Sequence, residues 1–367
     1  MNSKENFSVS KYGRHYFEDV KKLWKEQYEP NYVSQRAILF KWLTEKNPFI
    51  GGDSPYFLLL HREKVVGMLG HMPLEFTVNG KKKRGYLSQD ALLALNYRGK
   101  GLGKILLQGI AEQVISFAGA IWFNEPNYRL YLKCGWLDVP GFYPYLKILD
   151  PTPFIKERFK GRILQNVASF LAKNFLKIRE GLRSSESFRQ VRVSEIEQFD
   201  EQFDEFFLTV SGQLGIIVMR DHKYLNWKFV EKPFHNYKRY AAIDEKGDLS
   251  GYIVIKKQVI ENEVRGKILD VLAHPDKPKV FAALISRGME EFKKVKVSYV
   301  EIVCTHSPFN KLLRKLGFIR ARSPLRFMVC NWENQFSEQF MGDIKNWYLT
   351  YSDVDGDAWE IDSADKW

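Results

Sequence analysis

The sequence has few of the residues that mark a secreted, metal-bound or membrane-spanning protein. Its three cysteines, Cys134, Cys304 and Cys330, are odd in number and far apart, so neither a disulfide framework nor a paired-cysteine metal site is available. No apolar run approaches the roughly 18 residues that span a bilayer, and the N-terminus has no apolar signal segment. The histidines show no HxH or HExxH spacing. These absences predict a cytoplasmic protein without a metal ion.

What the sequence does contain is enough apolar material for ordinary globular cores. The 367 residues are 45% hydrophobic and 15% aromatic, and this length favours two domains. The net charge is +12, which favours acidic partners such as phosphorylated cofactors, nucleic acid or an anionic membrane. Residues 154–183 hold eight Lys and Arg against two Glu, so half of that excess is concentrated in one segment.

The chain contains an internal repeat. The segment LFKWLTEKNPF, with Trp42, is echoed by YLNWKFVEKPF, with Trp227, and in both copies a proline follows the tryptophan by six residues. Further on, Gly135 lies 93 residues after Trp42, and Gly317 lies 90 residues after Trp227. Anchors that keep their order over this distance indicate a duplication and not a chance match.

Both copies show the same succession of strand and helix patterns, which predicts an α/β fold of the α+β kind with two tandem domains. Each domain is expected to be a mixed, mostly antiparallel sheet flanked by helices. In the first copy we expect strands at 7–10, 56–61, 65–78, 84–95 and 120–124, and helices at 103–117 and 126–134.

The same patterns predict the domain boundaries. We expect a first domain at 1–150, a basic amphipathic helical linker at 151–189, a second domain at 190–335 and an acidic C-terminal tail at 336–367. The tail does not fit a calcium-binding loop, and we expect it to be solvated.

A glycine-rich loop, RGKGLGK at residues 98–104, lies between an apolar strand and a helical run. Backbone amides of such a loop, together with a helix N-terminus, can bind a phosphate or pyrophosphate. The loop is one residue short of a P-loop, and Lys104 stands where the dinucleotide fingerprint has its third glycine. Neither an ATPase nor an NAD enzyme is supported, and a simple helix cap is the alternative.

These residues resemble the GCN5-related N-acetyltransferases (GNAT). RGKGLG fits the R/QxxGxG/A signature of that family, and Asn124, Tyr131, Gly135 and Trp136 stand at the spacing of a second family element. The match is specific over residues 86–136, extends to the fold over 7–150, and is weak over 190–330.

The resemblance implies that acetyl-CoA binds where the fourth and fifth strands separate. Backbone groups at Leu93, Ala94 and Leu95 would hold the pantetheine and the thioester carbonyl, and Asn124 would belong to the cofactor site. Tyr131 would donate the proton that the departing thiolate needs. The pyrophosphate would be bound by the amides of the loop residues Arg98, Gly99, Lys100, Gly101, Leu102, Gly103 and Lys104.

The general base is not evident. Asp90 and Glu75 are candidates, although a solvated carboxylate is the ordinary interpretation of either residue. The second copy has Pro275 and Pro278 where the glycine loop would be, and Leu313 in the place of Tyr131. It therefore looks like a degenerate domain that shapes the substrate site.

The resulting hypothesis is an acetyl-CoA-dependent N-acetyltransferase that acts on a primary amine of a small molecule or amino sugar, by direct transfer in a ternary complex. One alternative is an acyl or aminoacyl transferase that acts on a protein or peptidyl amine. Another is a non-catalytic CoA-binding scaffold on an anionic surface. No nucleic acid is expected. The basic segment 154–183 would pack on its own domain, cover the inter-domain groove, or contact an anionic membrane.

Overall fold

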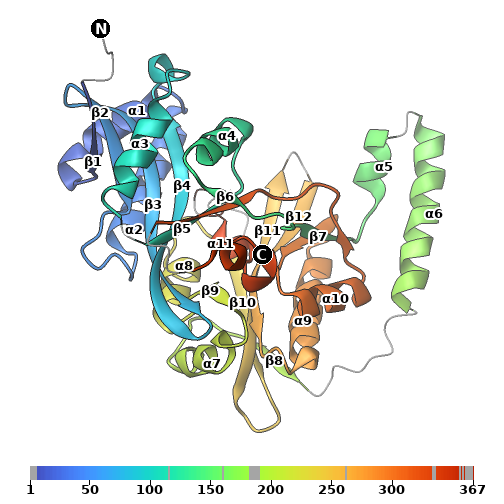
Figure 1. Ribbon diagram of the computed structural model, residues 1–367. Helices are drawn as coiled ribbons and strands as arrows, with labels where there is room; N and C mark the ends of the chain where they lie inside the picture. The colour runs from blue at the N-terminus through green and yellow to red at the C-terminus, as the bar shows by residue number, and fades with distance from the viewer. Residues whose placement is uncertain are drawn as a thin grey trace.

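The computed structural model describes residues 6–114, 116–158, 161–181, 191–260, 263–332, 336–354, 357, 359 and 367. Its strands form two mixed sheets, one drawn mainly in blue and cyan and one mainly in yellow and orange in Figure 1. Each sheet is mostly antiparallel and contains one parallel pair. The α+β fold with two tandem domains, predicted from the sequence, is confirmed.

The first sheet has the order β1-β2-β3-β4-β5-β15-β6, and β9 pairs with β3. Its parallel pair is β4 with β5. Helices α1 (Phe17–Lys25), α2 (Pro30–Glu45), α3 (Leu102–Ala111) and α4 (Glu125–Lys133) belong to this half, with a short 3-10 helix, η1 (Arg14–Tyr16). The strands are β1 (Phe7–Lys11), β2 (Tyr56–His61), β3 (Lys64–Val78), β4 (Lys81–Leu93), β5 (Phe117–Ile121), β6 (Leu137–Asp138), β9 (Ile216–Val218) and β15 (Phe327–Asn331).

The second sheet has the order β14-β7-β13-β12-β11-β10-β8, with β12 and β13 as its parallel pair. Read from β8 to β14, this order repeats that of the first sheet from β1 to β6. Its strands are β7 (Pro144–Ile148), β8 (Arg192–Glu195), β10 (Tyr237–Ile243), β11 (Leu249–Ile260), β12 (Glu263–Ala273), β13 (Tyr299–Val303) and β14 (Ile319–Arg320). Its helices are α7 (Gln202–Ser211), α8 (His222–Phe229), α9 (Pro278–Lys294) and α10 (Ser307–Lys315), and α11 (Glu338–Met341), η3 (Ile344–Asn346) and η4 (Tyr351–Asp353) follow.

The two halves exchange strands, and besides β9, which pairs with β3, two of these strands cover a sheet edge. β7 comes from the first half of the chain but pairs with β13 in the second sheet, and β15 comes from the second half but pairs with β5 in the first sheet. The expected boundaries at 1–150 and 190–335 assign each of these strands to its own half, and the pairing corrects that assignment. A strand with apolar residues on both faces can complete either sheet, so its own pattern does not reveal its partner.

Equivalent residues of the two halves meet at their interface. The rings of Trp42 and Trp227 stack with their centroids 4.8 Å apart, and Trp42 Nε1 donates a hydrogen bond to the Trp227 carbonyl oxygen at 3.2 Å. Equivalent positions contact each other directly only near a twofold axis. The repeated tryptophans therefore mark a pseudo-twofold axis between the halves, and both are buried.

One apolar core runs through both halves, and a second lies between the first sheet and helices α3 and α4. β3 lies between these two cores, and its residues from Val65 to Leu74 are buried on both faces. The helix that was expected at 103–117 ends at Ala111, and the strand expected at 120–124 occupies Phe117–Ile121. The apolar segment before residue 120 pairs as a strand with β4 instead of continuing the helix.

The expectation of a solvated C-terminal tail is wrong for residues 347–354, 357 and 359, which are buried. Trp347 and Tyr348 are part of the central core, and Asp353 and Asp357 are each 4% exposed. Arg220 binds both carboxylate oxygens of Asp353 at 2.8 and 2.9 Å. A buried carboxylate is tolerated when it is paired in this way, so the acidic composition of the segment does not make it a surface tail.

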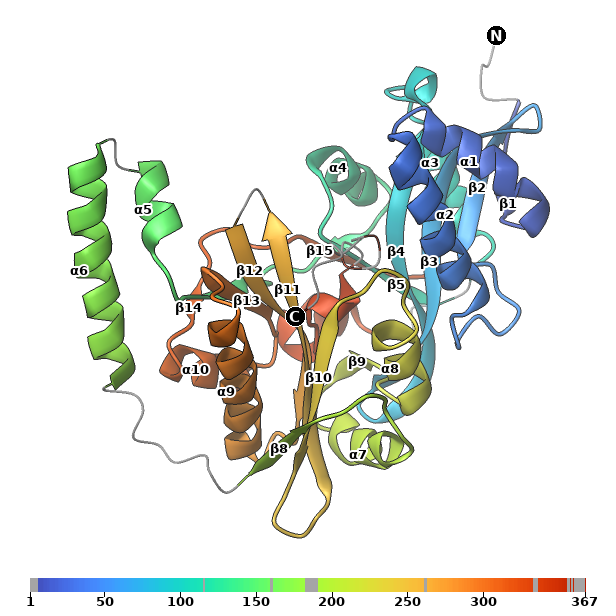
Figure 2. The ribbon, with the colours of Figure 1, turned by 180° about the vertical axis from the view of Figure 1, so that it is seen from behind.

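The basic linker forms two helices instead of one, α5 (Thr152–Arg158) and α6 (Arg162–Gly181). Figures 1 and 2 show α6 at the edge of the molecule, beside α5 and away from α4, β4 and β5. Among the described residues, no helix is both long and apolar enough to cross a membrane.

Candidate active site

The fourth and fifth strands separate beside a bulge. β4 pairs with β5 from Gly85 to Ser88, whereas β4 itself continues to Leu93. On its other edge β4 loses register with β3, so that two residues of β4, Asp90 and the next, oppose one of β3. Asp90 has a φ of +53° at this point. A bulge of this kind bends a strand and ends pairing, which explains why the edge of β4 beyond Ser88 is open toward β5.

The open edge presents backbone groups of Leu93. The amide of Ala94 donates to the Val66 carbonyl oxygen of β3 at 2.9 Å. Because the polar groups of successive residues alternate between the two edges of a strand, those of Leu93 point to the open edge. Its carbonyl oxygen there accepts hydrogen bonds from Gln27 Nε2 at 3.2 Å and Arg98 Nε at 3.1 Å. The Leu93 N–H points to the same edge, where a thioester carbonyl could accept its hydrogen bond.

The glycine loop follows a short 3-10 helix, η2 (Leu95–Tyr97), and leads directly into α3. Gly101 is the N-cap of α3 in the left-handed conformation, with a φ of +74°, and no side chain accepts a hydrogen bond from the first amides of the helix. Gly101 is exposed, and a Cβ there would meet no atom within 4 Å. Free amides at a helix N-terminus bind anions, so this loop can hold a phosphate group.

The other loop residues have different surroundings. The side chain of Arg98 turns back to Leu93 and Gln27, so that it braces the loop against the end of β4. At Gly103 a Cβ would lie 2.7 Å from Leu130 Cδ2, so this glycine permits close packing of α3 on α4. Lys100 and Lys104 are exposed beside the loop and add positive charge there.

Tyr131 lines a cleft between β4 and α4. It is 4% exposed, and its ring packs against Trp136 and Phe123, with centroids 4.5 and 5.2 Å away. Asn124 is the N-cap of α4 and accepts a hydrogen bond from the Asn127 amide at 3.0 Å. The cleft has a volume of about 220 Å³. Its other lining residues come from both separating strands, the loop after β5 and the start of α4: Ser88, Gln89, Asp90, Ala91, Ala120, Ile121, Trp122, Phe123 and Asn127.

Neither carboxylate that was considered as the base is free. Asp90 pairs with Arg36, and both side chains are at least 93% buried. Burial raises the pKa of Asp90, against the opposing effect of the Arg36 guanidinium. Glu75 pairs with Arg84 at 3.3 Å. The buried Asp90 carboxylate is held by Arg36 and is not open to an incoming amine, so the structure favours a positioning role for Asp90 at the bulge.

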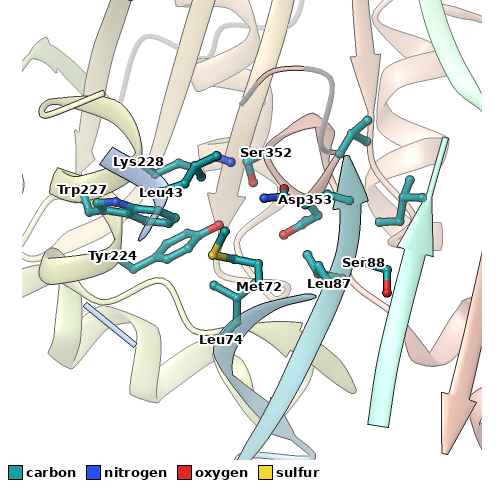
Figure 3. A pocket seen from close by; sticks show the side chains of 13 residues that line it. Leu43, Met72, Leu74, Leu87, Ser88, Tyr224, Trp227, Lys228, Ser352 and Asp353 are labelled. Carbon is teal, nitrogen blue, oxygen red and sulfur yellow. The ribbon is translucent and has the colours of Figure 1, made fainter. Parts of the chain in front are cut away.

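A second, narrower pocket lies between the two halves and adjoins the cleft through Ser88, Gln89 and Ile121, which line both (Figure 3). Ser88 Oγ lies 2.9 Å from His71 Nδ1 in the core. Complete burial lowers the pKa of His71 to about 3, so this imidazole stays neutral and is not a base at physiological pH. The pocket measures about 20 Å³, which is room for about one water molecule.

Lys228 is the cationic side chain that lines this pocket. It extends from α8, with Tyr224 beside it, and Ser352 and Asp353 of the C-terminal segment complete the wall (Figure 3). Within the described part of the chain, no carboxylate oxygen lies within 4 Å of Lys228 Nζ. Burial lowers the pKa of Lys228, although the carboxylates of Asp357 and Asp353 act in the opposite direction. Sequence reasoning missed these residues, because no local motif links α8 to the C-terminal segment.

In the second sheet the corresponding opening is filled by the chain itself. β12 pairs with β13 only from Gly266 to Ile268, and the C-terminal segment lies beyond that point. Thr350 donates a hydrogen bond to Asp270 of β12 at 2.8 Å and forms a bridge with Cys304, directly after β13. Pro275 and Pro278 of the adjoining loop have no backbone N–H to donate, and Leu313, which is buried, has no hydroxyl group.

Comparisons with known proteins agree with this geometry. The sequence model of the Acetyltransferase (GNAT) family matches residues 17–136. No curated protein matches the chain by sequence. A GCN5-related N-acetyltransferase from Anabaena variabilis is similar in structure, with a TM-score of 0.60 and 14% identity over 89% of this chain and 73% of that one.

Two further structures have the same fold. A GCN5-related N-acetyltransferase from Kribbella flavida has a TM-score of 0.56 and 13% identity, over 89% of this chain and 71% of that one. Saccharomyces cerevisiae N-myristoyltransferase with bound myristoyl-CoA has a TM-score of 0.55 and 14% identity, over 90% and 80%. The family match therefore identifies residues 17–136 as a domain of the GNAT acetyltransferase family, and the likeness to these structures extends the fold over most of the chain.

Proposed function

We propose that the chain is a cytoplasmic N-acetyltransferase that transfers the acetyl group of acetyl-CoA directly to a primary amine of a small molecule or amino sugar. The observation that carries this proposal is the open edge of β4, which lies between an uncapped helix N-terminus and a buried tyrosine. The loop at residues 98–104 binds the pyrophosphate through its amides and the positive end of α3. Three cysteines without a disulfide among them fit a reducing compartment.

In this mechanism the chain stabilises charge at two points. The Leu93 N–H donates to the thioester oxygen, which becomes negative when the amine attacks, and a preorganised donor of this kind lowers a barrier by about 2.7 to 4 kcal/mol. As the new C–N bond forms and the C–S bond breaks, Tyr131 gives its phenolic proton to the thiolate, and the proton that the amine nitrogen loses passes through water and restores the phenol. Phe123 and Trp136 hold the Tyr131 ring in place for this step.

The acceptor binds in the cleft, on the side that adjoins the pocket between the halves. The pocket between the halves adjoins the cleft at Ser88, and Lys228 supplies donors for oxygen atoms of the acceptor. The cleft measures about 220 Å³ and the adjoining pocket only about 20 Å³, so a small amine fits the cleft better than a folded protein surface does. This argument favours a small acceptor over a protein amine, which is the second candidate. A buried Tyr131 at the cleft argues against a pure scaffold, because binding alone needs no proton donor.

The test is a screen of small amines, amino sugars and N-terminal peptides, in which release of the CoA thiol is measured with acetyl-CoA as donor. We expect turnover with at least one small amine, and a Tyr131→Phe variant that binds acetyl-CoA but turns over slowly. Turnover with peptides alone would favour the protein acceptor. Binding of acetyl-CoA without turnover of any amine would favour the scaffold.

A further inference from the structure

Helix α6 has an apolar face without a partner in the described structure. Leu164, Val167, Phe170 and Leu171 are 61%, 54%, 66% and 62% exposed. Residues three, four and seven apart lie on one face of a helix, so these four side chains form one continuous patch. Scattered exposed apolar residues are normal, but a contiguous patch marks a site of interaction.

The position of α6 leaves this patch accessible. The helix packs beside α5 at the edge of the molecule (Figure 2), and Lys173 is tied to Asp150 by an ion pair of 3.3 Å. The apolar face is therefore not packed on either sheet, and it does not cover the groove between the halves. Packing on its own domain and covering the inter-domain groove, two of the three roles expected for the linker, are therefore excluded for these four side chains.

The charge of the linker indicates which kind of partner the apolar patch of α6 binds. Helix α6 carries Arg162, Lys173, Lys177 and Arg179 against a single carboxylate, Glu180. In α5, the side chains of Lys156 and Arg158 are exposed, and in α6 that of Lys173 is exposed. Protein interfaces are depleted in lysine at their centres, whereas helices that lie on membranes combine Phe and Leu on one face with Lys and Arg on the other. This composition matches an anionic lipid surface better than it matches a protein.

We propose that α6 lies flat in the headgroup region of an anionic membrane, with Leu164, Val167, Phe170 and Leu171 inserted below the phosphate groups. The helix has 20 residues, so it can lie about 30 Å along the surface. Each Lys or Arg near an anionic surface strengthens binding about fivefold, and the apolar side chains supply the remaining affinity. This contact rests on the helix alone and is independent of the acetyltransferase activity.

The experiment is co-sedimentation of the full chain with vesicles of pure phosphatidylcholine and of phosphatidylcholine with phosphatidylglycerol. We expect binding to the anionic vesicles that weakens with added salt, and at least tenfold weaker binding to the neutral ones. The double variant Phe170→Glu with Leu171→Glu should lose at least tenfold in its partition coefficient, because two large apolar side chains no longer insert.

The matched control is Leu208→Glu, since Leu208 of α7 is 64% exposed and lies outside the linker. This variant should bind vesicles like the unchanged protein, and all variants should keep the same melting temperature and acetyl-CoA affinity. Equal binding to neutral and anionic vesicles, or no binding at all, would overturn the proposal. So would sedimentation that shows a dimer which only the α6 variant dissociates, because the patch would then cover a second copy of the chain.

Discussion

The role of the glycine loop can be tested at Gly101, where backbone strain and ligand binding can be separated. Gly101 has a φ of +74° and a ψ of 11°. For a residue with a Cβ, this left-handed conformation lowers the stability of the fold by about 1 to 2 kcal/mol. No atom of the described residues lies within 4 Å of the position that a Cβ would take, so Gly101→Ala adds no clash with them to this cost. The Cβ would instead project from the exposed loop, beside the first amides of α3.

The expected effect on binding is larger than the effect on stability. A hydrogen bond between a backbone amide and a charged phosphate contributes about 1.5 to 3 kcal/mol. Loss of one such bond raises the dissociation constant of acetyl-CoA about 10- to 150-fold. Calorimetric titration measures this constant, and a thermal melt of the same preparation measures the strain.

Gly247 provides the matched control. It lies in the turn between β10 and β11 of the second sheet, has a φ of +89°, and also has no atom within 4 Å of a Cβ. Gly247→Ala should therefore lower the melting temperature by a similar amount and leave the affinity for acetyl-CoA unchanged. If Gly101→Ala melts like this control and still binds acetyl-CoA as tightly as the unchanged protein, the loop is only a helix cap.

Four further outcomes follow from the site and the core. Tyr131→Phe should lower kcat about 10²- to 10⁴-fold and leave acetyl-CoA affinity unchanged, because the ring contacts remain; an unchanged chemical step would reassign the residue to packing. Titration should give one acetyl-CoA per chain, and two equal sites would contradict the closed second opening. Lys228→Met should raise the KM of the acceptor without affecting acetyl-CoA binding; an unchanged KM would remove Lys228 from the acceptor site. Burial opposes ionisation of Glu291, but Lys238 and its other cationic neighbours outweigh it and lower its pKa to about 2. The stability it contributes is therefore complete above its ordinary pKa of 4.5 and lost as the pH falls toward 2, so the stability difference from Glu291→Gln should shrink over that window in urea unfolding.

The parts of the fold that local spacing describes were predictable from the sequence. Strand β2 was expected at its observed bounds, and helix α4 was expected within one residue of its own observed bounds. Both are predictable because alternation and helical spacing act over a few residues. The duplication was predictable as well, since Trp42 and Trp227 keep their place in the order of elements. Their direct stacking was not, because a repeat in sequence does not state how its copies face each other.

What the sequence could not show depends on partners far apart in the chain. Asp90 is a plausible base by its position on a strand, but its partner Arg36 lies 54 residues away. Asp353 looks like part of a solvated acidic segment, yet its partner Arg220 lies 133 residues away. Charge compensation over such separations has no local pattern, so these side chains could be interpreted only with the tertiary structure in hand.

The exchange of β7 and β15 has a consequence for how this chain can be divided and how it arose. A cut near residue 150 would leave β5 and β13 each without the strand that now covers one edge, so neither half would be a complete domain. Two half-chains should instead form the complete structure only when both are present, because each supplies a strand to the sheet of the other. The architecture is that of a strand-swapped homodimer whose subunits have been joined in one polypeptide. After such a fusion the two halves no longer had to stay identical, so one could keep its opening for the acyl donor while the other closed over its own C-terminal segment.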